Sequence, residues 1–253
     1  APEDADPEDE DVWAACMPAL GHTITVDAIR AEYRAALRDN NLNGFRRAYL
    51  NQWVLKEDPD ADVVITADDW AALEHVEDSR PDPVVFTIDV ADSRKWAHIA
   101  LAGKRSDGGT HVQVVRSDRG TGWVVDKLVE LRDEHRPLVV ALNPSSPACS
   151  LIPDLQAAGV ELELIGGREE AASCGAFVDG VAQKSIRHGG QKLLAVSIGV
   201  ARRRMRGNTW VWKTSEESTD IAPLRAVTLA AYALDRALAA PKKKRSGLVV
   251  GLR

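Results

Sequence analysis

The chain has 253 residues, of which 45% are hydrophobic and 28% are charged, an ordinary composition for a globular protein. Its formal net charge of −6 is uneven, because the first eleven residues carry seven acids and no base. Without that stretch the charge is +1, so net charge does not exclude a polyanionic partner. Three cysteines without metal-type spacing suit a reducing compartment, and no apolar run is long enough to span a bilayer.

Composition and hydrophobic pattern divide the chain into segments, with the main domain boundary expected between about 60 and 83. The expected segments are an acidic disordered stretch over 1–12, a helical appendage and linker over 13–80, a main domain over 81–240 and a basic tail over 241–253. The acidic stretch is expected to be disordered because it has little apolar surface to bury. Since the chain begins with Ala1 and not Met, we expect a fragment of a longer protein.

The order of elements in the main domain predicts an α/β fold. Three apolar, β-branched runs with short links predict antiparallel strands over 84–91, 96–105 and 110–117. Two further strands are expected over 138–142 and 160–165, each after a helix. This order resembles the ribonuclease-H-like arrangement: a mixed sheet, with three antiparallel strands and then parallel additions, flanked by helices.

The remaining elements follow those strands. We expect helices over 169–183, 192–206 and 221–238, a turn at 188–190 and a short strand over 209–213.

Polar residues stand at the ends of three predicted elements and are candidates for a metal site. Asp89 ends the apolar run of the first strand, Asn143 follows the strand over 138–142, and Asp220 precedes the last helix. Mg²⁺ and Mn²⁺ prefer such oxygen donors, and two-metal phosphodiester cleavage needs them from separate elements. The alternatives are that backbone N–H groups or an Arg satisfy Asp89, that Asp220 caps its helix, and that Asn143 is only a turn residue.

A second group of candidates could contact the phosphates of DNA. Its members are Arg202, Arg203, Arg204, Arg206, Lys213 and His188. The arginines are expected to face outward from the helix over 192–206, so phosphate contact and a simple solvated helix face are equally compatible with the pattern. His188 is expected to lie exposed in its turn.

In order and spacing, these segments resemble the C-terminal part of the large terminase subunit of tailed bacteriophages. The resemblance rests on 13–53, on 84–91, on 138–143 with 151–155, on 177–188 and on 210–226. It implies a ribonuclease-H-like endonuclease that uses two Mg²⁺ or Mn²⁺ ions to cut concatemeric DNA during packaging. Asp89, Asn143 and Asp220 would be its catalytic positions.

The resemblance also implies partners and a location. Double-stranded DNA would be the substrate, and the portal and small terminase subunit would be partners of the full-length protein. No membrane partner is expected, and the chain would act in the host cytoplasm and not be secreted. The sequence has no GxxxxGK[ST] phosphate loop, so we infer no ATP hydrolysis from it.

One position departs from the terminase pattern, which has an acid where Asn143 stands. Asn offers one neutral carbonyl oxygen and so binds a second metal more weakly. The spare acids are Asp92, Asp179 and Glu217, and Glu217 is preferred as a supporting metal ligand because it lies three residues before Asp220. Two other hypotheses stay open: a DNA-gripping module with weakened or lost cleavage, and a resolvase-like or transposase-like nuclease of the same fold.

Overall fold

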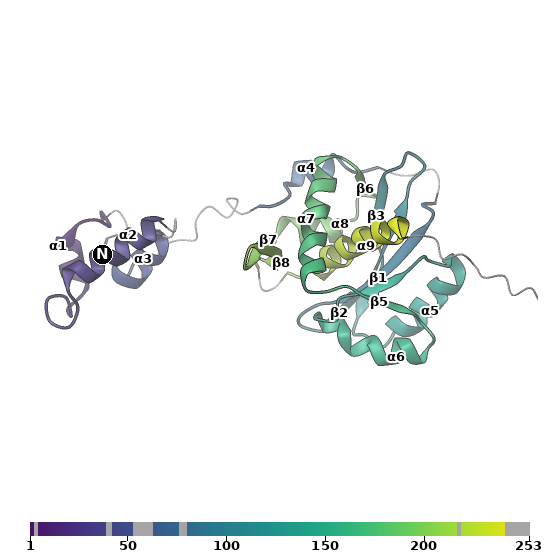
Figure 1. Ribbon diagram of the computed structural model, residues 1–253, viewed down its shortest axis with the longest axis horizontal. Coiled ribbons are helices and arrows are strands. Elements are labelled where there is room, and N and C mark those ends of the chain that lie inside the picture. Colours follow the sequence, from purple (N-terminus) through teal and green to yellow (C-terminus); the bar gives the residue numbers. More distant parts are fainter. Residues whose placement is uncertain (3–4, 39–41, 53–62, 76–79, 217–218, 241–253) are drawn as a thin grey trace, which may run out of the picture. The chain divides into compact units, whose positions relative to one another are not determined.

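The computed structural model describes residues 1–2, 5–38, 42–52, 63–75, 80–216 and 219–240. The chain divides into two compact units, Ala1–Ala61 and Asp62–Arg253 (Figure 1). The basic tail expected over 241–253 lies outside the described residues. No helix in the described ranges has both the length and the apolar character needed to cross a bilayer.

The small unit is helical, as expected for the N-terminal appendage. Its helices are α1 (Glu10–Cys16), α2 (Val26–Arg38) and α3 (Leu42–Tyr49). Aromatic side chains form its core, with the rings of Trp13 and Phe45 6.1 Å apart between centroids. The described part of 1–12 departs from the disorder expected of it. Asp9 caps α1 by accepting a hydrogen bond from the Asp11 N–H, and Trp13 Nε1 donates to the Pro7 carbonyl at 2.9 Å.

The large unit contains a mixed sheet and a separate hairpin. The strands are β1 (Val84–Val90), β2 (Trp96–Lys104), β3 (Thr110–Arg119), β4 (Val140–Leu142), β5 (Leu162–Leu164), β6 (Ile186–His188), β7 (Ala201–Arg206) and β8 (Thr209–Thr214). Within the described residues the sheet has six strands in the order β5-β4-β1-β2-β3-β6. The pairs β1–β2 and β2–β3 are antiparallel, whereas β4, β5 and β6 join by parallel pairing. The predicted fold class is therefore confirmed.

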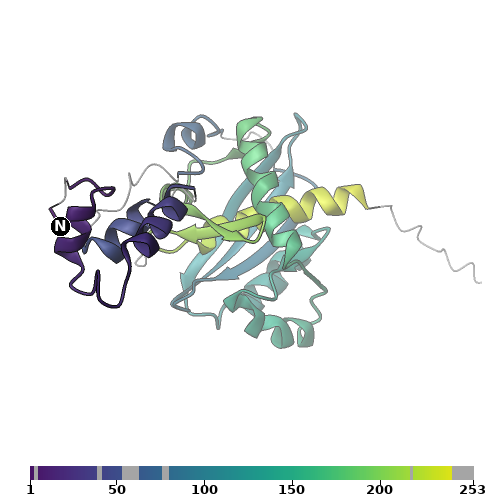
Figure 2. The same ribbon diagram turned by 60° about the vertical axis from the view of Figure 1, so that its left-hand side comes forward.

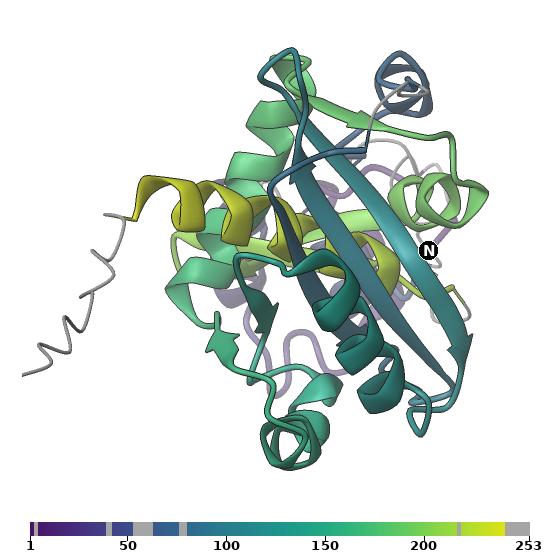
Figure 3. The same cartoon turned by 90° about the vertical axis from the view of Figure 1, so that its right-hand side faces the viewer.

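Helices cover both faces of this sheet. They are α4 (Ala67–Ala71), α5 (Val124–His135), the 3₁₀ helix η1 (Pro147–Leu151), α6 (Ile152–Ala157), α7 (Arg168–Ala182), α8 (Lys192–Gly199) and α9 (Ala222–Ala239). Figure 3 shows α5 on one face and α9 on the other. The five strands expected up to residue 165 are all present, with ends within two residues of those predicted.

Strand β1 is buried along its whole length, and its alternating side chains enter two different cores. Phe86 and Ile88 pack with the residues of α5. Thr87 points to the opposite face, where its Oγ1 donates to the Ala226 carbonyl in α9 at 2.8 Å. Asp89 is two residues further along the strand, so its side chain lies on the α9 face as well.

Two predicted elements are wrong. The expected turn at 188–190 overlaps strand β6, which ends at His188 and pairs with β3 at the edge of the sheet. The expected helix over 192–206 ends at Gly199, and the arginine-rich stretch is strand β7. Pairing of β7 with the aromatic and β-branched strand β8 outweighs the helical pattern, and Met205 on β7 is 65% exposed.

Candidate functional site

A cavity of about 190 Å³ lies where β1 and β4 end. Its lining is mostly polar and holds charges of both signs. The polar and charged residues of the lining are Asp89, Asp92, Asn143, Ser145, Ser146, Glu170, Ser173, Arg204, Arg206, Arg225 and Thr228. The sequence thus brings two of its three predicted catalytic positions, Asp89 and Asn143, into one cavity. They meet because parallel strands β1 and β4 end at the same edge of the sheet.

Asp89 is 5% exposed and is paired with Arg225 from the first turn of α9. Arg225 Nε donates to Asp89 Oδ2 at 2.6 Å, and the other carboxylate oxygen, Oδ1, accepts the Val90 N–H at 2.8 Å. Burial raises the pKa of Asp89 above its ordinary value, while Arg225 acts in the opposite direction. Burial also opposes the charge of Arg225, yet the carboxylates of Asp89 and Asp92 outweigh it and raise the pKa of Arg225.

Asp220 reaches the same face of the sheet through His98. The Nε2 of His98 donates to Asp220 Oδ2 at 2.8 Å, and His98 stands directly opposite Asp89 in the β1–β2 ladder. Asp220 Oδ1 accepts the Ala222 N–H at 2.8 Å, so the predicted cap-type contact at the start of α9 is present as well. Although burial acts to raise it, the pKa of Asp220 is lowered by the hydrogen bonds from His98 and from the Ala222 N–H.

His98 is a residue of this site that sequence reasoning missed. Its side chain is 1% exposed, and its Nδ1 has no hydrogen-bond partner among the described residues. The available signal was one polar residue inside the apolar run of β2, opposite the position of Asp89. A buried imidazole of this kind needs a polar partner, which here is Asp220.

Asn143 forms a local turn beside the cavity. Its Oδ1 accepts the Ser145 N–H at 2.8 Å, which is the turn role foreseen as an alternative. The same oxygen is closely packed, since a Cβ added to Gly166 would lie 3.0 Å from it. Asn143 therefore brings an oxygen donor to the cavity, but without the negative charge of an acid.

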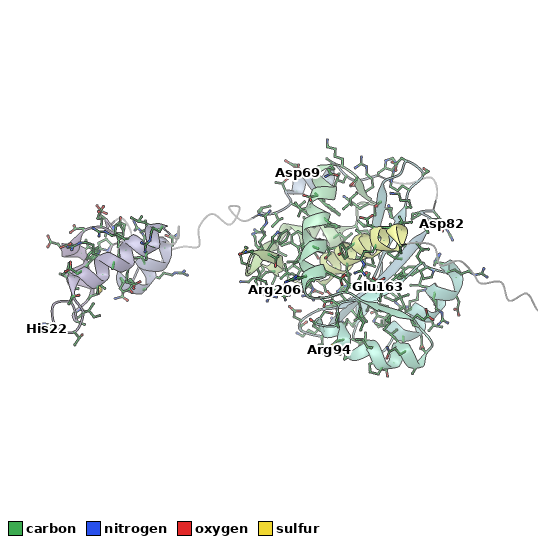
Figure 4. All side chains as sticks on the ribbon, viewed as in Figure 1. His22, Asp69, Asp82, Arg94, Glu163 and Arg206 are labelled. Carbon is green, nitrogen blue, oxygen red and sulfur yellow. The ribbon has the colours of Figure 1, made fainter. Side chains whose placement is uncertain are left out.

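The predicted DNA-contacting arginines lie on strand β7 of the β7–β8 hairpin. The hairpin packs beside α9 (Figure 2), and Trp212 Nε1 on β8 donates to Thr228 Oγ1 on α9 at 3.0 Å. Arg204 and Arg206 line the cavity, and Figure 4 labels Arg206 at this hairpin. Arg206 Nη1 pairs with Glu170 Oε2 at 2.7 Å.

The other predicted contacts and spare acids are distributed differently. Arg202 and Lys213 are cross-strand partners in the hairpin, and the guanidinium of Arg203 lies 5.0 Å from the ring centroid of Trp210. Asp179 belongs to α7 and lines a separate pocket with Asp235, so it does not reach the site. Glu217 lies outside the described residues.

The prediction that His188 lies exposed in a turn is wrong. His188 is 2% exposed on β6, and its ring stacks on Trp70 with centroids 3.9 Å apart. Its Nε2 donates to the Trp70 carbonyl at 2.8 Å, while its Nδ1 accepts the Gly190 N–H. Burial lowers the pKa of His188, which matches a neutral ring with these two bonds. His188 holds α4 against the sheet and has no surface for DNA.

Asp89, Asp92 and Asn143 line one cavity and carry oxygen atoms. Oxygen atoms are the ligands that a hard divalent cation such as Mg²⁺ prefers. No cluster of three or more His, Cys, Asp or Glu side chains forms a metal centre in the part of the chain that the structure describes. Asp89 is instead neutralised by Arg225. The residues therefore fit a metal ion, provided that Arg225 releases the carboxylate.

The strand order and pairing of the sheet give the large unit a ribonuclease-H-like fold. Neither a protein-family model nor a curated protein matches the sequence. Among solved structures, the chain is similar to the large terminase of bacteriophage HK97, with a TM-score of 0.64 and 18% identity. That match covers 92% of this chain and 56% of the other, so this chain spans little more than half of that protein's length.

Isolated terminase nuclease domains show the same fold. The large terminase nuclease of the thermophilic phage G20c, solved with bound magnesium, matches with a TM-score of 0.52 and 13% identity over 68% of this chain and 97% of that one. The nuclease domain of Thermus phage P74-26 matches with a TM-score of 0.51 and 14% identity over 67% and 93%. The resemblance predicted from the sequence motifs is thus confirmed at the level of the fold.

Proposed function

We propose that the large unit is the DNA-cutting domain of a phage packaging terminase and acts as a metal-dependent endonuclease on concatemeric double-stranded DNA. The observation that carries this proposal is the strand-end cavity that holds Asp89 and Asn143 in a fold shared with terminase nuclease domains. Ligand chemistry in sheets of this kind takes place at strand ends, which is where these two residues stand.

The acidic residues have distinct roles in this proposal. Asp89, Asn143 and Asp92 would present oxygen atoms to the cations, and Asp220 would approach from the start of α9. Bound Mg²⁺ or Mn²⁺ would supply an activated water and stabilise the leaving oxygen. His98 fixes one oxygen of Asp220 and so orients the carboxylate.

The arginines of the hairpin would hold the DNA backbone next to the cavity. Arg204 and Arg206 line it, and Arg202 and Lys213, which pair across the β7–β8 ladder, would add positive charge on the same face of the hairpin as Arg204. Contacts to phosphates position DNA without reading bases, so little sequence selectivity is expected. In the complete packaging motor, in the host cytoplasm, the portal and the small terminase subunit would be the protein partners.

A second candidate function is a DNA-gripping module that cleaves weakly or not at all. Two points favour it: the neutral Asn143 lines the cavity where the resemblance to terminases implies an acid, and Arg225 already balances the charge of Asp89. The neutral side chain of Asn143 and the Arg225–Asp89 pair both reduce the negative charge that would attract a pair of divalent cations.

Cleavage of supercoiled plasmid in the presence of Mn²⁺ tests the proposal. We expect the wild-type chain to nick the plasmid and both Asp89→Ala and Asp220→Ala to abolish nicking. Asp133→Ala, at an exposed acid on α5, is the matched control and should behave as wild type. Nicking that survives in both site variants would reject the assignment, and DNA binding without any nicking would favour the gripping module.

A further inference from the structure

The guanidinium of Arg225 makes three contacts at the end of β1. Its Nε donates to Asp89 Oδ2 at 2.6 Å, its Nη1 donates to Asp92 Oδ1 at 3.0 Å, and its Nη2 donates to the Val90 carbonyl at 3.1 Å. The side chain of Arg225 is 21% exposed and that of Asp89 is 7% exposed. This is a mostly buried, multiply bonded ion pair, which differs from the weak pairs of an open surface.

Both carboxylate oxygens of Asp89 are hydrogen-bonded within the folded chain. Oδ1 accepts the Val90 N–H, and Oδ2 is bonded to Arg225. The Val90 contact is local to the strand, whereas the Arg225 contact comes from a different element, α9. A cation that binds Asp89 Oδ2 must therefore displace the guanidinium from this oxygen or share the oxygen with it.

The neighbouring charges favour the same conclusion. Asn143 contributes no charge, and Glu170 is already paired with Arg206. Arg225 balances Asp89 and shares Asp92, so the cavity holds little unpaired negative charge to draw in a divalent ion.

We propose that Arg225 is the resident counter-cation of Asp89 and that it competes directly with a divalent metal ion for this carboxylate. The inference rests on the proposed function in one respect only, the choice of a divalent metal as the competing cation. Arg225 thereby sets the metal affinity of the site: removing its charge strengthens metal binding, and keeping a cation at position 225 preserves the competition.

Calorimetric titration of the whole chain with Mn²⁺ tests this inference. Arg225→Met removes the charge while keeping an extended apolar stem, and we expect it to bind Mn²⁺ on the order of tenfold more tightly than wild type or better. Arg225→Lys keeps a cation and should stay close to wild type. Arg236→Met, on the same helix but paired with Glu163 at the surface, is the control and should change nothing.

A thermal unfolding series gives a second readout, since a bound ion stabilises the folded state according to its affinity. Added Mn²⁺ should raise the unfolding temperature of Arg225→Met more than that of wild type. If Arg225→Met does not fold, Arg225→Gln, which keeps a hydrogen-bond donor for Asp89, takes its place with the same expectation. Equal or weaker Mn²⁺ binding by a folded neutral variant overturns the inference.

The two proposals fail separately. Tighter Mn²⁺ binding by Arg225→Met without any DNA cleavage would count against the endonuclease and support the competition at Asp89. Unchanged Mn²⁺ affinity of Arg225→Met together with Asp89-dependent cleavage would support the endonuclease and count against the competition at Asp89.

Discussion

His98 stands directly opposite Asp89 in the antiparallel ladder of β1 and β2, and its Nε2 donates to Asp220 at 2.8 Å. Residues opposite each other in such a ladder point to the same face of the sheet. Two aspartates that are 131 positions apart in the chain therefore lie on the α9 face, Asp89 opposite His98 in the ladder and Asp220 bonded to the His98 ring. If the two carboxylates lay on opposite faces of the sheet, they could not belong to one site.

We predict that His98→Ala lowers the free energy of unfolding by about 1–3 kcal/mol, because the Asp220 carboxylate loses a buried partner. Urea denaturation monitored by circular dichroism measures this. His75→Ala, at an exposed histidine of the same unit, is the control and should stay within about 0.5 kcal/mol of wild type. A His98→Ala variant as stable as that control would show that the His98–Asp220 hydrogen bond contributes nothing to the free energy of unfolding.

The lowered pKa of Asp220 predicts a pH dependence of stability. A carboxyl whose folded-state pKa lies below its ordinary 3.8 stabilises the fold above that value and loses the contribution as the pH falls through the lowered pKa. The stability difference between wild type and Asp220→Asn should therefore be fully developed well above pH 3.8 and shrink on acidification below that value. Denaturant unfolding at a series of acidic pH values measures it, and a difference that grows on acidification would contradict the assignment.

Removing Arg204 and Arg206 together should weaken binding to double-stranded DNA without changing sequence preference. Each lost phosphate contact reduces the dependence of log K on log salt by roughly one unit. Fluorescence anisotropy of a labelled duplex at several salt concentrations gives this slope. Removing Lys127 and Arg132, two cations on α5, is the control, because α5 covers the other face of the sheet. Equal slopes in the two double variants would place DNA elsewhere.

Asn143→Asp should increase both Mn²⁺ affinity and plasmid nicking, because it adds a negative oxygen to the cavity while keeping the bond from the Ser145 N–H. Calorimetry and the plasmid assay measure the two effects. Gln156→Glu makes the same amide-to-acid change at an exposed position of α6 and serves as the control. Mn²⁺ affinity and nicking that change no more in Asn143→Asp than in Gln156→Glu would remove this residue from the site.

The strand ends of the site could be predicted because apolar runs stop at them. Asp89 and Asn143 each follow a run that is too short for a helix, and parallel pairing of β1 with β4 then brings them together. The same local pattern could not distinguish helix from strand at Arg202–Arg206. Their conformation depends on pairing with β8, a tertiary effect that the segment itself does not encode.

Arg225 and His98 escaped sequence reasoning for a related reason. Each is a polar residue within an apolar run, and the identity of its partner depends on how distant elements meet. A lone arginine in the first turn of a largely buried helix does indicate a buried acceptor, but the sequence gives no means of choosing Asp89 among the many acids.

The most direct test of the central claim is a crystal of the chain soaked in Mn²⁺ well above the measured dissociation constant, with the ion located by its anomalous scattering. We predict an ion in the cavity, bound to carboxylate oxygen of Asp89 and amide oxygen of Asn143, with Arg225 no longer bonded to Asp89. An ion bound only elsewhere, with the Arg225–Asp89 pair intact and the cavity without Mn²⁺, would contradict the account.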